Sequence, residues 1–152
     1  MGGRKGLEDV YRAQAGRMWR ALVGYSGDPE IASDALAEAF ARALRYEEQI
    51  LDLEPWLWRV SFRLASAELK QRSGSNSSTD SPIYEMPDPL PELIAALRRL
   101  SPNQRLAVVL HDYADRSTQQ VAETLGCSRA TVHVHLSQGR RRLRNLLEAS
   151  DE

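Results

Sequence analysis

The stretch from Ser117 to Arg144 reads STQQVAETLGCSRATVHVHLSQGRRRLR and decides the fold of the C-terminal part of the chain. Ser117 and Gln120 have the spacing of a capping box, in which a serine and a glutamine satisfy free N–H groups at a helix start. Gly126 suits the left-handed residue that ends a helix, and Ser128 can cap the next helix. The stretch therefore predicts two helices joined by a tight glycine turn.

The second of these helices has two faces with different residue types. Its apolar or small residues recur at three- and four-residue steps, which is the spacing of a helix face packed on a core. They are Val132, Leu136, Gly139, Leu143 and Leu146, and we expect them to face Val121, Ala122 and Leu125. The opposite face is mostly polar and basic.

This outer face is suited to DNA. In a helix-turn-helix the second helix enters the major groove and presents its outer face to base edges and phosphates. A helical hairpin with a solvated basic end is the alternative. We predict DNA contacts from Arg129, Thr131, His133, Val134, Ser137, Gln138 and Arg141.

Charge is unevenly distributed along the 152-residue chain, whose net charge of -1 is unusual for a nucleic-acid binder. Five basic residues and no acidic residue lie from Arg129 to Arg144. Basic charge therefore gathers in the segment predicted to contact DNA, which favours DNA binding over the hairpin alternative.

Residues 73–91 read SGSNSSTDSPIYEMPDPLP and show no apolar period. A segment dominated by Gly, Ser and Pro is typical of a flexible linker. We therefore divide the chain into a domain at residues 1–72, a linker at 73–91 and a domain at 92–152.

The N-terminal domain is predicted to contain three helices. The first shows apolar residues at helical steps and ends between Gly24 and Gly27. Asp28 suits the N-cap of the second helix and Pro29 its first position, and Pro55 opens the third. The predicted fold class is all-α, with two small helical domains on a flexible linker, the C-terminal one a helix-turn-helix.

Composition and motifs exclude several classes of protein. Hydrophobic residues make up 42% of the chain, and no apolar run approaches the roughly 18 residues of a membrane helix. The N-terminus does not read as a secretory signal, so we expect a soluble, cytoplasmic protein. Cys127 is the single cysteine, and His133 and His135 point to different helix faces. We expect no metal, no cofactor and no enzyme, because no phosphate loop or Ser/His/Asp arrangement is present.

Three segments carry a resemblance to a known family. Residues 101–147 resemble the region-four domain of ECF (extracytoplasmic function) sigma factors: SPNQRLAVVLHDYADRSTQQVAETLGCSRATVHVHLSQGRRRLRNLL. Residues 27–44, GDPEIASDALAEAFARAL, resemble the polymerase-binding helix of region two. Residues 54–72, EPWLWRVSFRLASAELKQR, resemble the following segment that reads the minus-ten element. Both domains thus match in the order that is characteristic of this family.

The resemblance implies a subunit that brings RNA polymerase to a promoter and catalyses nothing itself. In this family the N-terminal domain binds the beta-prime clamp helices and the minus-ten element. The C-terminal domain binds the minus-35 element and the beta flap. The resemblance implies that Asp34, Glu38 and Arg42 dock on the polymerase. Their spacing puts them on one helical face. An anti-sigma factor is a further partner that the resemblance implies.

The same resemblance implies that four residues contact the minus-ten element: Tyr46, Trp58, Arg59 and Arg63. Capture of a flipped base needs an aromatic surface for stacking and cations for the phosphates. Trp56 and Trp58 cannot both face one side of a helix, so we expect at least one of them in the core.

The sequence departs from the family pattern near these positions. Ala37 stands where a glutamine is common, and Arg63 replaces a usual asparagine. The loop expected to face DNA is acidic and repels phosphates, with Glu47, Glu48, Asp52 and Glu54. A second hypothesis therefore stays open: a sigma-like DNA-binding regulator that does not itself support initiation.

Overall fold

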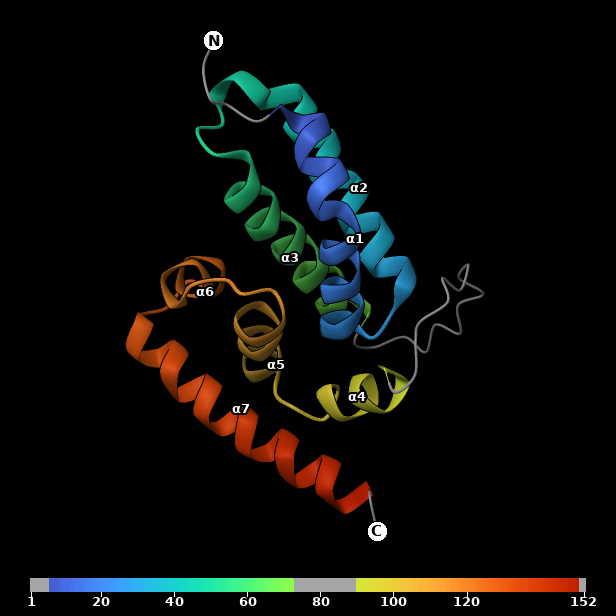
Figure 1. Ribbon diagram of the computed structural model, residues 1–152, viewed down its shortest axis with the longest axis vertical. Coiled ribbons are helices and arrows are strands. Elements are labelled where there is room, and N and C mark those ends of the chain that lie inside the picture. The colour runs from blue at the N-terminus through green and yellow to red at the C-terminus, as the bar shows by residue number, and fades with distance from the viewer. Residues whose placement is uncertain (1–5, 73–89, 151–152) are drawn as a thin grey trace.

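The computed structural model describes residues 6–72 and 90–150, and all regular structure within these ranges is helical. The N-terminal half contains α1 (Leu7–Ser26), α2 (Pro29–Tyr46), the short 3-10 helix η1 (Glu47–Gln49) and α3 (Leu53–Arg72). The C-terminal half contains α4 (Leu90–Leu97), α5 (Pro102–Val108), the π-helical turn η2 (Val109–Tyr113), α6 (Thr118–Leu125) and α7 (Arg129–Ser150). Figure 1 shows the two halves in contact. The predicted all-α class is confirmed.

The junction between α1 and α2 follows the local signals in the sequence. Gly27 ends α1 with a φ of 71°, in the left-handed region that favours glycine. The Asp28 side chain accepts a hydrogen bond from the backbone N–H of Glu30, and Pro29 is the first residue of α2. The predicted caps of the second helix are therefore confirmed.

Helix α1 ends at Ser26, within the predicted range from Gly24 to Gly27, and Gly24 lies in its last turn. A Cβ at this position would lie 3.8 Å from Leu97 Cδ1 and 3.9 Å from Val109 Cγ2. The small residue therefore allows α1 to approach α4 and η2 of the C-terminal half, a contact that local sequence signals do not reveal.

Two other boundaries differ slightly from the predicted ones. The third helix begins at Leu53, so that Pro55 lies within its first turn, where the missing N–H of proline costs nothing. Residues 73–89 of the predicted linker lie outside the described residues, whereas Leu90 and Pro91 already belong to α4.

The predicted helix-turn-helix is present in α6 and α7. Ser117 and Gln120 form the complete capping box at the start of α6, and Gly126 ends that helix with a φ of 75°. The Ser128 hydroxyl accepts a hydrogen bond from the backbone N–H of Thr131 and thereby caps α7. Local capping thus determines where both helices start.

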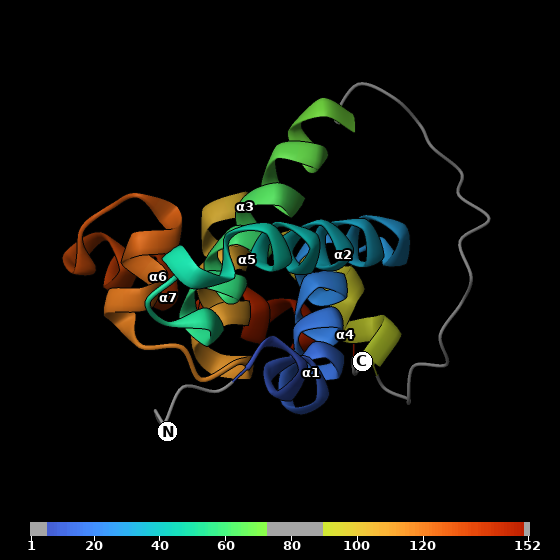
Figure 2. The same cartoon turned by 90° about the horizontal axis from the view of Figure 1, so that it is seen from above.

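Buried side chains of the two halves form one continuous apolar cluster. Helix α3 packs against α6, while α1 packs against α4 and η2. Figures 1 and 2 show the C-terminal helices beside α1 and α3, while the C-terminal end of α3 projects away from them. Tyr25 and Phe62 from the N-terminal half, and Leu97 and Leu110 from the C-terminal half, are all buried in this cluster. The two domains therefore share a core at their contact.

Gly139 is the point of closest approach between α7 and α5. A Cβ there would lie 3.0 Å from Val108 Cγ2 and 3.4 Å from the Gln104 carbonyl oxygen. Because one of these neighbours is backbone, a larger side chain must push the two helices apart.

We expect Gly139→Leu to destabilise the protein by about 1–3 kcal/mol, because overpacking outweighs the better helix propensity of leucine. Gly16→Leu is the matched control, since a Cβ at Gly16 would meet only the end of the flexible Arg20 side chain, at 3.5 Å. Chemical denaturation measures both changes. An equal or higher stability of Gly139→Leu would contradict the close packing of α5 and α7.

Candidate nucleic-acid interface

Helix α7 exposes the face that was predicted to contact DNA. All seven predicted residues are solvent-exposed: Arg129, Thr131, His133, Val134, Ser137, Gln138 and Arg141. Val132 and Leu136 of the opposite face are buried together with Val121 and Ala122 of α6. The core-facing assignment therefore agrees with the structure, and the outer face is exposed, with a side-chain contact from Gln104 of α5 to Gln138.

The N-terminal turn of α7 is fixed by a small hydrogen-bond network. Ser128 Oγ lies 2.9 Å from Thr131 Oγ1 and 3.1 Å from the Thr131 backbone nitrogen. These bonds hold the predicted base-contacting Thr131 in one place relative to the helix axis. A rigid first turn is useful in a recognition helix because its N-terminal residues meet the base edges.

Gln138 has a neighbour that orients it. Gln104 Nε2 donates a hydrogen bond to Gln138 Oε1 at 3.3 Å. The amide nitrogen of Gln138 keeps its two donors for another partner, such as a base acceptor. The predicted role of Gln138 in base reading is therefore sterically open.

The arginines of α7 differ in their partners. Arg140 donates from Nε and Nη2 to the two carboxylate oxygens of Asp112, at 2.8 and 2.6 Å. These hydrogen bonds raise the pKa of Arg140. Arg129 and Arg141 form no ion pair with any residue in ranges 6–72 and 90–150. Arg141 is thus available for phosphates, whereas Arg140 ties α7 to η2.

The predicted polymerase-docking residues of α2 lie along one side of that helix. Asp34 is exposed, and Glu38 and Arg42 are half-buried. Arg42 Nε donates to Glu38 Oε1 at 2.9 Å, and Arg45 lies 3.6 Å from the same carboxylate. The hydrogen bond from Arg42 lowers the pKa of the Glu38 carboxyl, which keeps it ionised.

The predicted minus-ten residues are not gathered on one open surface. Tyr46, at the end of α2, is 49% exposed, with the Arg45 guanidinium 6.0 Å from its ring centre. Trp58 is only 2% exposed and stacks on Phe62 at a centroid distance of 6.1 Å. Trp58 is therefore a buried tryptophan in this arrangement, as expected for at least one member of the pair, and cannot stack on a base.

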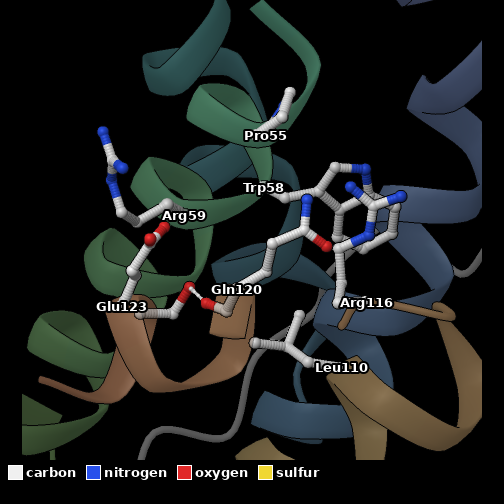
Figure 3. Close-up of a pocket in the computed structure, with 8 residues that line it drawn as sticks. Pro55, Trp58, Arg59, Leu110, Arg116, Gln120 and Glu123 are labelled. Carbon is white, nitrogen blue, oxygen red and sulfur yellow. Dashed lines mark hydrogen bonds between the residues drawn. The ribbon is translucent and has the colours of Figure 1, made fainter. Parts of the chain in front are cut away.

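Residues of the C-terminal half help to bury the Trp58 side chain. The Arg116 guanidinium lies 5.1 Å from the centre of the Trp58 ring, a cation–π contact. The indole Nε1 is buried without a hydrogen-bond partner among the described residues. Figure 3 shows the Arg116 guanidinium over the Trp58 ring beside a pocket, while the Arg59 side chain points away from both. The pocket is lined by residues of α3, η2, the loop before α6 and α6: Pro55, Trp58, Arg59, Leu110, Arg116, Gln120, Glu123 and Thr124.

Arg63 also points to the C-terminal half. Its Nη2 donates to the carbonyl oxygen of Glu123 at 2.6 Å, and its Nε lies 3.5 Å from that of Thr124. These carbonyls belong to the last turn of α6, where backbone acceptors lack intrahelical donors. A residue predicted from the resemblance to contact DNA is here a partner of the helix-turn-helix.

Sequence reasoning missed the arginines that join the two halves from the other side. Arg105 of α5 is 9% exposed, donates from Nη1 to the Tyr25 carbonyl oxygen at 3.1 Å, and lies over the Tyr25 ring. Arg116 pairs with Glu54 at 3.1 Å. An arginine beside an apolar run carries no signal for such a distant partner.

Neither a metal site nor a membrane span is found in the part of the chain that the structure describes. Among residues 6–72 and 90–150, no three His, Cys, Asp or Glu side chains are grouped so that they could hold a metal ion. Within the same ranges, no helix has the length and apolar character required to cross a bilayer.

We expect Ser128→Ala to destabilise the protein by about 1 kcal/mol, because the N-cap of α7 loses its acceptor. Ser137→Ala is the matched control on the same helix, and as an exposed substitution it should change stability by less than about 0.5 kcal/mol. Urea denaturation compares the two. Equal effects would show that the Ser128 cap does not stabilise α7.

Comparison with known proteins gives matches over both halves. The family model described as Sigma-70, region 4 matches residues 90–143. The ECF RNA polymerase sigma factor SigE of Mycolicibacterium smegmatis is 30% identical over 156 residues, which cover 92% of this chain and 61% of SigE. The chain thus spans less than two thirds of that relative. The RNA polymerase sigma-E factor of Streptomyces antibioticus is 30% identical over 159 residues, which cover 95% of this chain and 86% of that protein.

A solved structure has the same fold. The sigma factor RpoE, crystallised in complex with the anti-sigma factor NepR from Bartonella quintana, aligns with a TM-score of 0.78 and 20% sequence identity. The alignment covers 93% of this chain and 96% of RpoE. With the 30% identity to the Streptomyces antibioticus factor, these matches confirm the identification made from the sequence: the chain belongs to the ECF-type RNA polymerase sigma factors of the sigma-70 family.

Proposed function

We propose that this protein binds core RNA polymerase and directs it to a specific set of promoters through two DNA-contacting domains. The observation that carries the proposal is the outer face of α7, where all seven predicted DNA contacts are exposed. A capped recognition helix with a basic outer face suits the major groove. Membership of the sigma factor family supports the polymerase as the partner.

The C-terminal domain, residues 92–152, is proposed to read the minus-35 element and to contact the beta flap. Arg141 would pair with a phosphate, and this contact positions the helix without reading sequence. Gln138, oriented by Gln104, would read a base edge. His133 and Ser137 offer further hydrogen-bonding groups on the same face.

The N-terminal domain, residues 1–72, is proposed to bind the beta-prime clamp helices and the minus-ten element. The ionised Glu38, held between Arg42 and Arg45, gives the docking face of α2 a defined charge pattern. Arg59 is proposed to contact promoter phosphates, and residues 73–91 to link the two domains. Linked domains raise the effective concentration of the second DNA contact once the first has formed.

Three further expectations follow from this role. The RpoE structure names an anti-sigma factor as the partner of that protein, which supports a similar regulator for this one. Because bacterial RNA polymerase works in the cytoplasm, we expect the protein there. We expect no catalytic activity of its own, since RNA synthesis belongs to the polymerase.

With core polymerase and a library of random promoter sequences, we expect transcripts that depend on this protein and share upstream elements. Glu38→Lys should lower core binding and transcription, because it reverses a charge on the docking face. Glu8→Lys is the matched control, as Glu8 also pairs with an arginine four residues later, on α1. Polymerase or DNA binding without any promoter-dependent transcript would favour the sigma-like regulator instead.

Two substitutions in α7 separate positioning from base reading. Arg141→Ala should weaken DNA binding at all sequences. It should also reduce the slope of log affinity against log salt concentration by about one, because one phosphate contact is lost. Gln138→Ala should change the preference at one or two base pairs. Binding selection from a random duplex library measures both effects. An equal loss of affinity on all sequences for Gln138→Ala would rule out its role in base reading.

A further inference from the structure

Gln104 of α5 and Gln138 of α7 form a side-chain contact beside the proposed recognition face. We propose that Gln104 is a positioning residue that fixes the polarity of the Gln138 amide. With that polarity α7 offers N–H donors to a keto base, guanine or thymine, in the minus-35 element. The proposal rests on the proposed function, because the polarity of Gln138 matters to a promoter only if α7 enters the major groove. It assigns a part in sequence preference to a residue outside the recognition helix.

Local capping holds the Gln104 side chain at the start of α5. Gln104 is the N3 residue of a complete capping box with Ser101. The Ser101 hydroxyl accepts a hydrogen bond from the Gln104 backbone N–H at 3.2 Å, and the Ser101 backbone N–H donates to Gln104 Oε1 at 3.3 Å. The amide of Gln104 is therefore bonded at one of its two ends before it meets α7.

The capping box also determines which end of the Gln104 amide faces α7. A backbone N–H can only donate, so the Gln104 atom that it meets must be the oxygen. The Gln104 nitrogen is then the other end of the amide, and it donates to Gln138 Oε1 at 3.3 Å. This nitrogen also can only donate, so it selects the oxygen of Gln138. The backbone donor of Ser101 thus sets the polarity of two amides in sequence.

Close packing brings the two glutamines within reach of each other. Gly139 follows Gln138 in the chain, and a Cβ at Gly139 would lie 3.3 Å from Gln104 Cβ and 3.4 Å from the Gln104 carbonyl oxygen. Backbone and Cβ atoms have little freedom to move. The position of Gln104 relative to α7 is therefore set by the contact of the two helices and not by the flexible end of its side chain.

Gln138 lies on the same face of α7 as the predicted base contact Thr131. The two residues are seven positions apart, which is close to two full helical turns, and both are exposed. Within residues 6–72 and 90–150, the Gln138 side chain forms its only hydrogen bond with Gln104. The nitrogen of Gln138 therefore keeps both N–H donors for a base further along the groove than the base at Thr131.

The chemistry of the base edges turns this polarity into a preference. In the major groove guanine shows the acceptors O6 and N7, and thymine shows the acceptor O4. Adenine and cytosine show amino groups, and the usual bidentate contact of glutamine to adenine needs the amide oxygen as well as the nitrogen. If Gln138 turned its oxygen to the base, its nitrogen would face the nitrogen of Gln104. Loss of that hydrogen bond should lower the affinity for an amino base by about twofold to tenfold.

One substitution can reverse the polarity. Gln104→Glu retains a side chain that completes a capping box, but its second carboxylate oxygen can only accept. Gln138 must then turn its nitrogen to position 104 and its oxygen to the groove. The full chain in complex with core polymerase is used to select from a library of random promoter sequences. The base read by Gln138 is the one whose preference Gln138→Ala removes.

At this base we expect guanine or thymine with the unsubstituted protein. Gln104→Glu should move the ratio of keto to amino bases by about twofold to tenfold towards adenine or cytosine. A preference of the unsubstituted protein for adenine or cytosine would overturn the assigned polarity. An unchanged ratio in Gln104→Glu would overturn the positioning role.

Gln120→Glu is the matched control, because Gln120 completes the same kind of capping box at the start of α6 and its amide pairs with Ser117. The added carboxylate should lower the affinity at all sequences and leave the base ratio unchanged. In a Gln138→Ala background, Gln104→Glu should leave the ratio unchanged as well. An equal shift in that background would show that position 104 acts on the base without Gln138, which overturns the proposal.

The contact itself is tested without DNA, by NMR of the isotope-labelled full chain. Gln104→Glu should move the side-chain amide signals of Gln138, because its N–H groups turn to a carboxylate, whereas Gln120→Glu should leave these signals in place. Unmoved Gln138 signals in Gln104→Glu would overturn the contact. Moved signals without any upstream sequence preference of the unsubstituted protein would instead reject the proposed minus-35 role of α7, and the base preference with it.

Discussion

Two arginines that cap helix ends across the domain boundary set the arrangement of this protein. Arg105 reaches from α5 to the end of α1, and Arg63 reaches from α3 to the end of α6. In both cases a planar, charged donor meets carbonyl groups that have no donor within their own helix. The bond of Arg105 is buried and satisfies a carbonyl that water does not reach, whereas the bonds of Arg63 are exposed to solvent. The apolar contact around Tyr25 and Leu97 can therefore form without leaving those carbonyls unpaired.

The same interface has features that limit its strength. Within residues 6–72 and 90–150, Arg105 Nε and the Trp58 indole nitrogen are both buried without a hydrogen-bond partner. Each such group loses hydration without a full return in hydrogen bonds. The outer ion pair of Arg17 and Asp115 is exposed and contributes little. The contact between the two domains therefore combines buried apolar packing with polar groups that are only partly satisfied.

The DNA-facing groups of the two domains differ in how they are supported. In α7 the recognition face stands on a local scaffold, with Ser128 at the N-cap and the close approach at Gly139 holding the helix on α5. This face is complete within one domain. In α3, by contrast, the environment of Trp58 and Arg63 depends on the other domain. The recognition face of α7 is thus supported within its own domain, whereas the surroundings of Trp58 and Arg63 are set by the contact between the domains.

The sequence by itself determined the helices and their caps, because these depend on residues only a few positions apart. The capping box of Ser117 and Gln120 and the exposed face of α7 were predicted from spacing alone, and the sigma family from the order of the motifs. The tertiary structure decided the partners of Arg63, the burial of Trp58 and the approach of α4 and η2 to Gly24. Each of these depends on residues brought together across the linker, and a side chain suited to DNA is equally suited to helix carbonyls or to a cation–π contact. Only the packing of the two domains selects between those partners.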